Sequence, residues 1–333
     1  MRESRGIVPE PAEQLSRADD RVAEVVPNGP FSFALSARGS SDACRRFRGQ
    51  ALTALVEGGS GVEIAQARQR PDGTVALSAG SDRGLERLRF VLALDDDHSA
   101  FLQHFADDPL LGASLRALSG LRPIRLTTVA NSLLRALCGQ LITAREARSI
   151  EARVIRRVSP RDSASGLFAP PTQERLAALS PAELCRLGLA PKRAATLVRI
   201  CRTLDLERLR ELPSSSVFAR LAREREIGPW SIGVIFLEGL GRYDHGLVAD
   251  LGLVKLCSVL ADRRASEAET AELLARYGEW EGLASLYLLR GSRRGLVPLG
   301  RGVESVELGA SALRMRSKQP LALRDGRGID SAR

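Results

Sequence analysis

The sequence is poor in the residues that build metal clusters and disulfide frameworks. Its five cysteines, among 333 residues, are widely spaced and form no Cys-x-x-Cys pair. That spacing argues against a zinc ribbon or an iron–sulfur cluster. None of the three histidines lies at metal-binding spacing from a second histidine or a carboxylate cluster. We therefore expect no metal, no cofactor and no disulfide framework, as in a protein of the reducing cytoplasm.

Long apolar runs are also lacking. The first 26 residues are charged and contain no apolar core of a signal peptide. No later run approaches the length of a membrane span. The chain also lacks the Gly-x-Ser-x-Gly, Walker and dinucleotide-binding patterns. These absences argue against a membrane protein and against the enzyme classes that those patterns mark.

Lysine is scarce, yet the chain is basic. Lysine and arginine together number 49 against 40 acidic residues, which gives a formal charge of +9 and a pI of about 10.0. The only lysines are Lys192, Lys255 and Lys318. A basic chain favours a polyanionic partner, and the planar guanidinium of arginine suits phosphate. A high-GC genome would enrich arginine equally, so the composition leaves both explanations open.

The apolar pattern changes along the chain and predicts an α+β protein in four parts. Residues 1–28 are of mixed charge and predict a disordered leader, and residues 301–333 predict a basic, solvated tail. Residues 29–97 predict an N-terminal antiparallel β-sheet domain with helices, because alternating apolar stretches at 31–35 and 62–64 precede the turn Pro71-Asp72-Gly73 and a returning strand at 74–77. Residues 98–300 predict an all-α core.

Apolar residues at helical spacing predict the individual helices. They lie at residues 85–92, 99–105, 110–118, 128–158, 172–179, 181–187, 191–204, 206–212, 214–225, 232–240, 251–261, 266–277 and 280–289. Gly139 and Gln140 interrupt the longest of these stretches. Thr143 and Glu146 then have the spacing of a capping box, so we expect two helices between residues 128 and 158.

Two stretches of the helical part are candidates for chemistry. Ile227-Gly228-Pro229-Trp230-Ser231 predicts a tight turn between two helices, whose backbone amides can bind phosphate. Residues 248–253 place Asp250 among apolar residues just before a helix. Taken singly, the first stretch also fits an ordinary helix–helix corner, and Asp250 also fits a plain helix N-cap.

Together the two stretches resemble the helix–hairpin–helix and catalytic aspartate of the DNA base-excision glycosylases. Within that superfamily the resemblance is to the 3-methyladenine DNA glycosylase II branch. Three further segments resemble the branch in the same order: residues 137–143, residues 188–194, and Glu279-Trp280 with Tyr287. The resemblance covers roughly residues 125–290, and the strands from Phe31 fit the extra N-terminal β domain of these enzymes.

The resemblance implies a monofunctional DNA glycosylase. Such an enzyme flips alkylated bases of the 3-methyladenine type out of double-stranded DNA and hydrolyses the N-glycosidic bond, which starts base-excision repair. It implies a monomer near the nucleoid, with DNA as its partner and no membrane contact. Asp250 would be the catalytic carboxylate, and Trp230 stands where bifunctional relatives carry a Schiff-base lysine. The base pocket would comprise Trp230, Val234, Leu289 and Leu141, with Leu141 as a wedge in the duplex, and the DNA contacts would come from Gln140, Ile227, Gly228, Pro229 and Ser231.

Three positions depart from the pattern of the family. Glu226 stands where the family usually has glycine, and a carboxylate there would face phosphate. Val234 and Leu289 stand where well-known relatives carry aromatic residues. Two alternatives therefore remain beside the leading hypothesis: a non-catalytic DNA-binding protein that acts as a lesion sensor or regulator, and a glycosylase with lyase activity on oxidised bases.

Overall fold

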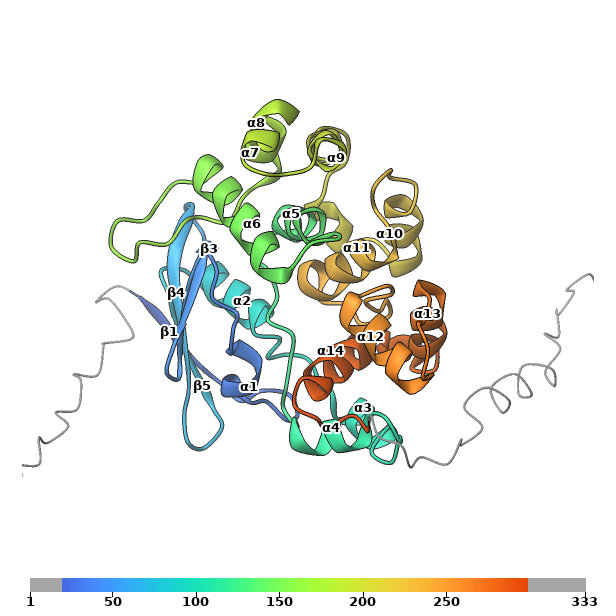
Figure 1. Ribbon diagram of the computed structural model, residues 1–333. Helices are drawn as coiled ribbons and strands as arrows, with labels where there is room; N and C mark the ends of the chain where they lie inside the picture. The colour runs from blue at the N-terminus through green and yellow to red at the C-terminus, as the bar shows by residue number, and fades with distance from the viewer. Residues whose placement is uncertain (1–19, 299–333) are drawn as a thin grey trace, which may run out of the picture. The chain divides into compact units, whose positions relative to one another are not determined.

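A five-stranded antiparallel sheet forms the N-terminal part of the protein, whose computed structural model describes residues 20–298 (Figure 1). The strands are β1 (Arg21–Val25), β2 (Arg45–Arg48), β3 (Ala51–Glu57), β4 (Val62–Gln69) and β5 (Val75–Ala79), in the order β1-β5-β4-β3-β2. At the predicted turn between β4 and β5, the amide of Arg70 donates to the carbonyl of Thr74 at 2.8 Å. The predicted antiparallel sheet and its last turn are confirmed.

Two predictions for this part are wrong. Residues 31–35 form no strand, because the hydroxyl of Ser32 caps a helix, α1 (Phe33–Ala37), and accepts from the amide of Leu35 at 3.4 Å. Residues 21–25, within the expected disordered leader, form β1 and pair with β5. Backbone pairing orders this edge strand, whose side chains are exposed or half-buried. Residues 1–19 of the expected leader lie outside the described residues.

One helix covers the sheet. α2 (Asp82–Val91) packs against β3, β4 and β5, and the hydroxyl of Ser81 caps it by accepting from the amide of Gly84 at 3.1 Å. Small residues permit the close approach of α2 to the sheet. A Cβ added to Gly84 of α2 would lie 3.0 Å from the Cβ of Ala79 in β5. The strands β2 and β3 are absent from the sequence prediction, although β3 carries the buried side chains Leu52 and Val56.

Short helices make up the rest of the described chain, in agreement with the predicted helical core. They are α3 (Ser99–His104), α4 (Gly112–Ala117), α5 (Val129–Gly139), α6 (Ala144–Val158), α7 (Gln173–Ala177), α8 (Pro181–Arg186), α9 (Pro191–Thr203), η1 (Glu207–Arg210), α10 (Ser214–Leu221), α11 (Pro229–Val234), η2 (Ile235–Leu240), α12 (Leu251–Leu260), α13 (Glu267–Ala275), η3 (Gly278–Trp280) and α14 (Glu281–Ser292). The predicted break at Gln140 is confirmed, and so is the capping box of Thr143 and Glu146.

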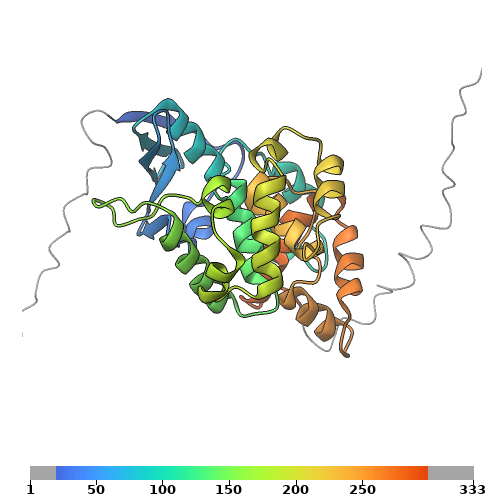
Figure 2. The ribbon, with the colours of Figure 1, turned by 90° about the horizontal axis from the view of Figure 1, so that it is seen from above.

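α5 is the central helix of this part. Its side chains are buried from Val129 to Cys138, and it contacts α6, α9, α11 and η2 (Figure 2). The apolar core around α5 takes in residues from α9, α10 and α11, while a second core forms around α4, α12 and α14. Because α5 is surrounded, its C-terminal end at Gly139 has a defined position beside the turn that begins α11.

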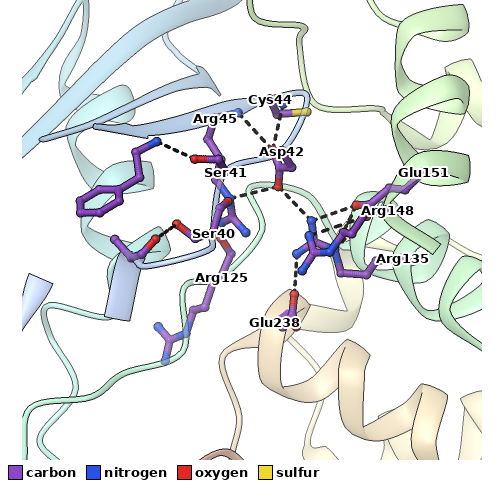
Figure 3. A network of polar contacts seen from close by, with 12 residues as sticks. Ser40, Ser41, Asp42, Cys44, Arg45, Arg125, Arg135, Arg148, Glu151 and Glu238 are labelled. Atoms are coloured by element: carbon purple, nitrogen blue, oxygen red, sulfur yellow. Dashed lines mark hydrogen bonds and ion pairs between the residues drawn. The ribbon is translucent and has the colours of Figure 1, made fainter. Parts of the chain in front are cut away.

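A buried charge cluster joins α5 to the segment between α1 and β2 (Figure 3). Arg135 of α5 contacts Glu151 of α6 at 2.9 Å, Glu238 of η2 at 2.6 Å and Asp42 at 2.9 Å. Burial alone would lower the pKa of Arg135, but the three carboxylates outweigh it and raise that pKa well above its ordinary value. We call these four residues the Arg135 cluster. The guanidinium of Arg135 therefore stays charged, and it ties α5 to α6, to η2 and to the loop that carries Asp42.

The domain boundaries near residues 28, 97 and 300 stay predictions, and the expected basic tail at 301–333 lies outside the described residues. Within residues 20–298, no helix is long and apolar enough to cross a bilayer.

Candidate active site

The predicted turn between helices is present, from the end of α10 at Leu221 to the start of α11 at Pro229. Gly228 is the N-cap of α11, with extended backbone (φ −91°, ψ 178°), and a Cβ added to it would meet nothing within 4 Å. Pro229 occupies the first helical position, where a missing amide costs nothing. Gly228 and Pro229 are exposed, whereas Ile227 and Ser231 are buried. The tip of the hairpin therefore presents backbone to solvent, and its base is anchored in the core.

Glu226 keeps the geometry that glycine would favour. Its φ is +65°, in the left-handed region. The side-chain amide of Gln140 donates to the carbonyl of Glu226 at 2.6 Å and to the hydroxyl of Ser231 at 2.9 Å. Gln140 thus ties the end of α5 to both sides of the hairpin turn. Glu226 therefore places a carboxylate at this turn, at a φ that glycine adopts without strain.

Asp250 is the N-cap of α12. Its Oδ1 accepts from the amide of Gly252 at 2.7 Å, and its Oδ2 accepts from the indole Nε1–H of Trp230 at 3.0 Å. The carboxylate is half-buried, and it lies at the positive end of the α12 dipole. The capping role and a chemical role are therefore compatible, because one lone pair of each oxygen is not used by these two bonds.

Side chains of α13 and α14 hold the loop that carries Asp250. The hydroxyl of Thr270 accepts from the amide of Ala249 at 2.7 Å, and the hydroxyl of Ser285 accepts from the amide of Leu247 at 2.9 Å. Ala249 has φ +65°, an uncommon value for a residue with a Cβ. No sequence pattern marks these supports, since Thr270 and Ser285 lie 20 and more residues beyond Asp250 and look like ordinary helix positions.

Trp230 lies between Asp250 and the end of α5. Its indole N–H faces the carboxylate, and the far edge of its ring faces Gly139, where an added Cβ would lie 2.5 Å from Cη2 of Trp230. The tryptophan is half-buried. Gly139 could have been read from the sequence only as a helix breaker, whereas in the structure it makes room for this ring.

Leu141 is the most exposed large apolar side chain among the described residues. It is 82% exposed and has φ +58° in the short connection between α5 and α6. The guanidinium of Arg193 donates to the preceding carbonyl, that of Gln140, at 2.7 Å. An apolar side chain held out on a pinned turn costs free energy in water.

The two remaining predicted pocket residues lie in different environments. Val234 is buried in the apolar core around α5. Leu289 of α14 is half-buried, and a Cβ added to Gly252 would lie 2.6 Å from its Cδ2. The structure therefore brings Leu289 to the first turn of α12 beside Asp250, together with Trp230. It places Val234 one helical turn beyond Trp230, in the core.

A polar cavity of about 460 Å³ lies elsewhere, beside the start of α5 and the end of α9, and shares no residue with the Asp250 group. Its lining includes four carboxylates, those of Glu57, Glu174, Asp205 and Glu207. Negative charge of this kind repels a polyanion, so the Asp250 group is the better candidate site. Residues 20–298 contain no group of three or more His, Cys, Asp or Glu side chains placed to hold a metal ion.

No protein-family model matches the chain, although individual proteins of known sequence or structure do. A DNA-3-methyladenine glycosylase of Bacillus subtilis is 26% identical over 206 residues, which cover 59% of this chain and 68% of that protein. A 3-methyladenine DNA glycosylase structure from Archaeoglobus fulgidus superposes with a TM-score of 0.70 at 18% identity, over 82% of this chain and 98% of that one. A Clostridium acetobutylicum 8-oxoguanine glycosylase/lyase, solved with double-stranded DNA, gives 0.68 at 16% identity, over 83% and 99%.

The two structures share the α+β fold, and the Bacillus protein shares sequence over more than half of the chain. The structure also joins the turn at Gly228 and the carboxylate of Asp250 through Trp230. The chain therefore resembles the helix–hairpin–helix DNA glycosylases in sequence over more than half of its length, and it shares their fold.

Proposed function

We propose that the protein is a monofunctional DNA glycosylase of the 3-methyladenine type. It flips an alkylated base out of double-stranded DNA and hydrolyses its N-glycosidic bond, the first step of base-excision repair. It acts as a monomer without a cofactor. The observation that carries the proposal is the Asp250 carboxylate, bound by the amide of Gly252 and by Trp230 beside the hairpin. The names of the Bacillus and Archaeoglobus proteins support the alkylated substrate.

Asp250 has the surroundings that this reaction needs. As the bond between C1′ and the base nitrogen breaks, its electron pair leaves with the base and positive charge develops on the sugar. A half-buried carboxylate stabilises that charge. Water then bonds to C1′ and gives up a proton, which a nearby carboxylate can accept. An alkylated base that is already cationic leaves as a neutral molecule, so no separate general acid is required.

Trp230 supports hydrolysis without a lyase step. A lyase of this superfamily needs a lysine nucleophile at this position, and an indole cannot form a Schiff base. Of the two lysines in residues 20–298, Lys255 is exposed, five residues beyond Asp250 on α12. Trp230 and Leu289 form one side of the pocket for an electron-poor base, and Val234 backs Trp230 from the core.

The DNA contacts come from the hairpin and the α5–α6 connection. The exposed backbone around Gly228 and Pro229, with Ile227 and Ser231 anchoring it, binds a phosphate. Gln140 holds the hairpin against α5, and Leu141 fills the space of the flipped nucleotide. The formal charge of +9 favours the duplex as a partner.

The test is base release from duplexes that carry methylated, deaminated or oxidised bases, with the wild type and Asp250→Asn. We expect the wild type to release 3-methyladenine and 7-methylguanine. Asp250→Asn should lower the single-turnover rate by on the order of a hundredfold or more, with DNA affinity unchanged. Salt-dependent DNA binding without release of any base would favour the non-catalytic alternative, and a borohydride-trapped covalent complex would favour the lyase.

A further inference from the structure

We propose that Trp230 is a positioning residue, whose indole N–H holds the Asp250 carboxylate in the orientation that base release requires. Gly139 is the second part of this arrangement, because it leaves the space that the indole ring occupies. The inference rests on the proposed function and assigns to Trp230 a task beyond forming a wall of the base pocket.

The carboxylate of Asp250 is fixed at both oxygens. Oδ1 accepts from the amide of Gly252 at 2.7 Å, within the same helical turn. Oδ2 accepts from Nε1 of Trp230 at 3.0 Å, from a helix 20 residues earlier in the chain. One bond alone would leave the carboxylate free to rotate about the Cβ–Cγ bond. Two bonds from different helices define its plane, and a defined plane keeps one lone pair of each oxygen directed away from the donors.

The far edge of the Trp230 ring packs close to Gly139. A Cβ on Gly139 would lie 2.5 Å from Cη2 and 3.2 Å from Cζ3 of Trp230. The backbone of Gly139 cannot retreat, since α5 is buried along most of its length. Trp230 thus fills the space between α5 and Asp250. A ring displaced at one edge must move at the other, so the bond to Asp250 depends on Gly139.

This geometry matters because electrostatic stabilisation of a transition state needs a preorganised charge. A carboxylate that turns away from C1′ must be reoriented during the reaction, and that reorganisation raises the barrier. The loop before Asp250 is already anchored by Thr270 and Ser285. Thr270 and Ser285 bind the backbone of this loop, whereas Trp230 donates to the carboxylate itself.

Two variants separate positioning from stacking. Trp230→Phe keeps an aromatic face for the base but removes the N–H. Gly139→Ala keeps both Trp230 and Asp250 and displaces the ring. We expect each variant to lower the single-turnover rate of base release by on the order of tenfold to a hundredfold, as for a lost hydrogen bond to a charged group. DNA affinity should stay within about twofold of the wild type, because neither variant alters the hairpin backbone or Leu141, which make the proposed contacts with the duplex. Trp280→Phe is the matched control, since Trp280 packs on Phe101 and Phe105 in the other helical core.

A spectroscopic readout tests the bond directly. The chain has two tryptophans, so its ¹⁵N spectrum contains two indole N–H signals, which Trp280→Phe assigns. We expect Asp250→Ala and Gly139→Ala each to shift the Trp230 signal. An unmoved Trp230 signal in Asp250→Ala would show that the indole N–H makes no bond to the carboxylate.

The outcomes distinguish this inference from the proposed function. A wild-type rate in Trp230→Phe, or an unmoved indole signal in Asp250→Ala, overturns the inference while the effect of Asp250→Asn still supports the function. Absence of base release from the wild type overturns the function itself. If Trp230→Phe fails to fold, as judged by thermal unfolding, the rate and indole signal of Gly139→Ala decide the question.

Discussion

Replacing Glu226 by glycine is expected to stabilise the hairpin and to strengthen its binding to DNA. Glu226 has φ +65°, where a residue with a Cβ is strained and glycine is not. Its side chain is exposed, so the substitution removes no buried contact. The hydrogen bond from Gln140 goes to the backbone carbonyl of Glu226, and glycine keeps that carbonyl.

The size of the effect follows from two terms. The left-handed conformation costs an L-residue roughly 1–2 kcal/mol, and glycine gives back about 0.4–1 kcal/mol through the entropy of the unfolded chain. We expect the free energy of unfolding of Glu226→Gly to rise by about 0.5–1 kcal/mol. For DNA, a carboxylate at about 6 Å from a phosphate in water is repelled by about 0.7 kcal/mol. Its removal should improve affinity about threefold at low salt, and less at physiological salt.

The assay combines urea unfolding with DNA binding at several salt concentrations. Glu226→Gln is the matched control, because it removes the charge and keeps the strain of a side chain at positive φ. The glutamine variant should therefore gain affinity without gaining stability, and the glycine variant should gain both. Lower stability in Glu226→Gly would refute the strain argument, and equal low-salt affinities in the wild type and Glu226→Gln would refute the placement of the carboxylate beside phosphate.

Two further predictions concern stability. Arg135→Leu removes the cation that contacts all three carboxylates of the Arg135 cluster and leaves Asp42 with Arg45 and Glu151 with Arg148, which should cost about 3–5 kcal/mol in the free energy of unfolding. The exposed Arg148, 3.8 Å from Glu151, provides the control, since Arg148→Leu should cost less than about 1 kcal/mol. Urea unfolding measures both variants, and an equal loss in their free energies of unfolding would contradict the role of the Arg135 cluster. Burial raises the pKa of Asp96, but contacts with His98, Arg125 and Tyr243 outweigh it and lower that pKa to about 2. The charged Asp96 carboxylate contributes its full stabilisation above about pH 4, and about 2 kcal/mol of the free energy of unfolding is lost as the pH falls towards 2. Asp96→Asn should flatten the pH dependence of the free energy of unfolding in that range. An unchanged slope would contradict this role of Asp96.

Local interactions explain what could be predicted from the sequence. The break at Gln140, the capping box of Thr143 and Glu146, the turn before Pro229 and the N-cap at Asp250 are all made by residues a few positions apart. Such signals act within one turn of chain and are read directly from residue type and spacing. The same reasoning failed at residues 31–35, where an alternating apolar pattern competed with a capping serine and the cap prevailed.

The sequence by itself therefore determined most helices after residue 98, several of their caps and breaks, and the two stretches that carry the candidate site. Tertiary structure decided how those stretches meet. The bond between Trp230 and Asp250, the space at Gly139, and the support of the Asp250 loop by Thr270 join residues that are 20 or more positions apart. No short pattern encodes such contacts, because they exist only once the buried helix α5 has brought its C-terminal end beside the hairpin.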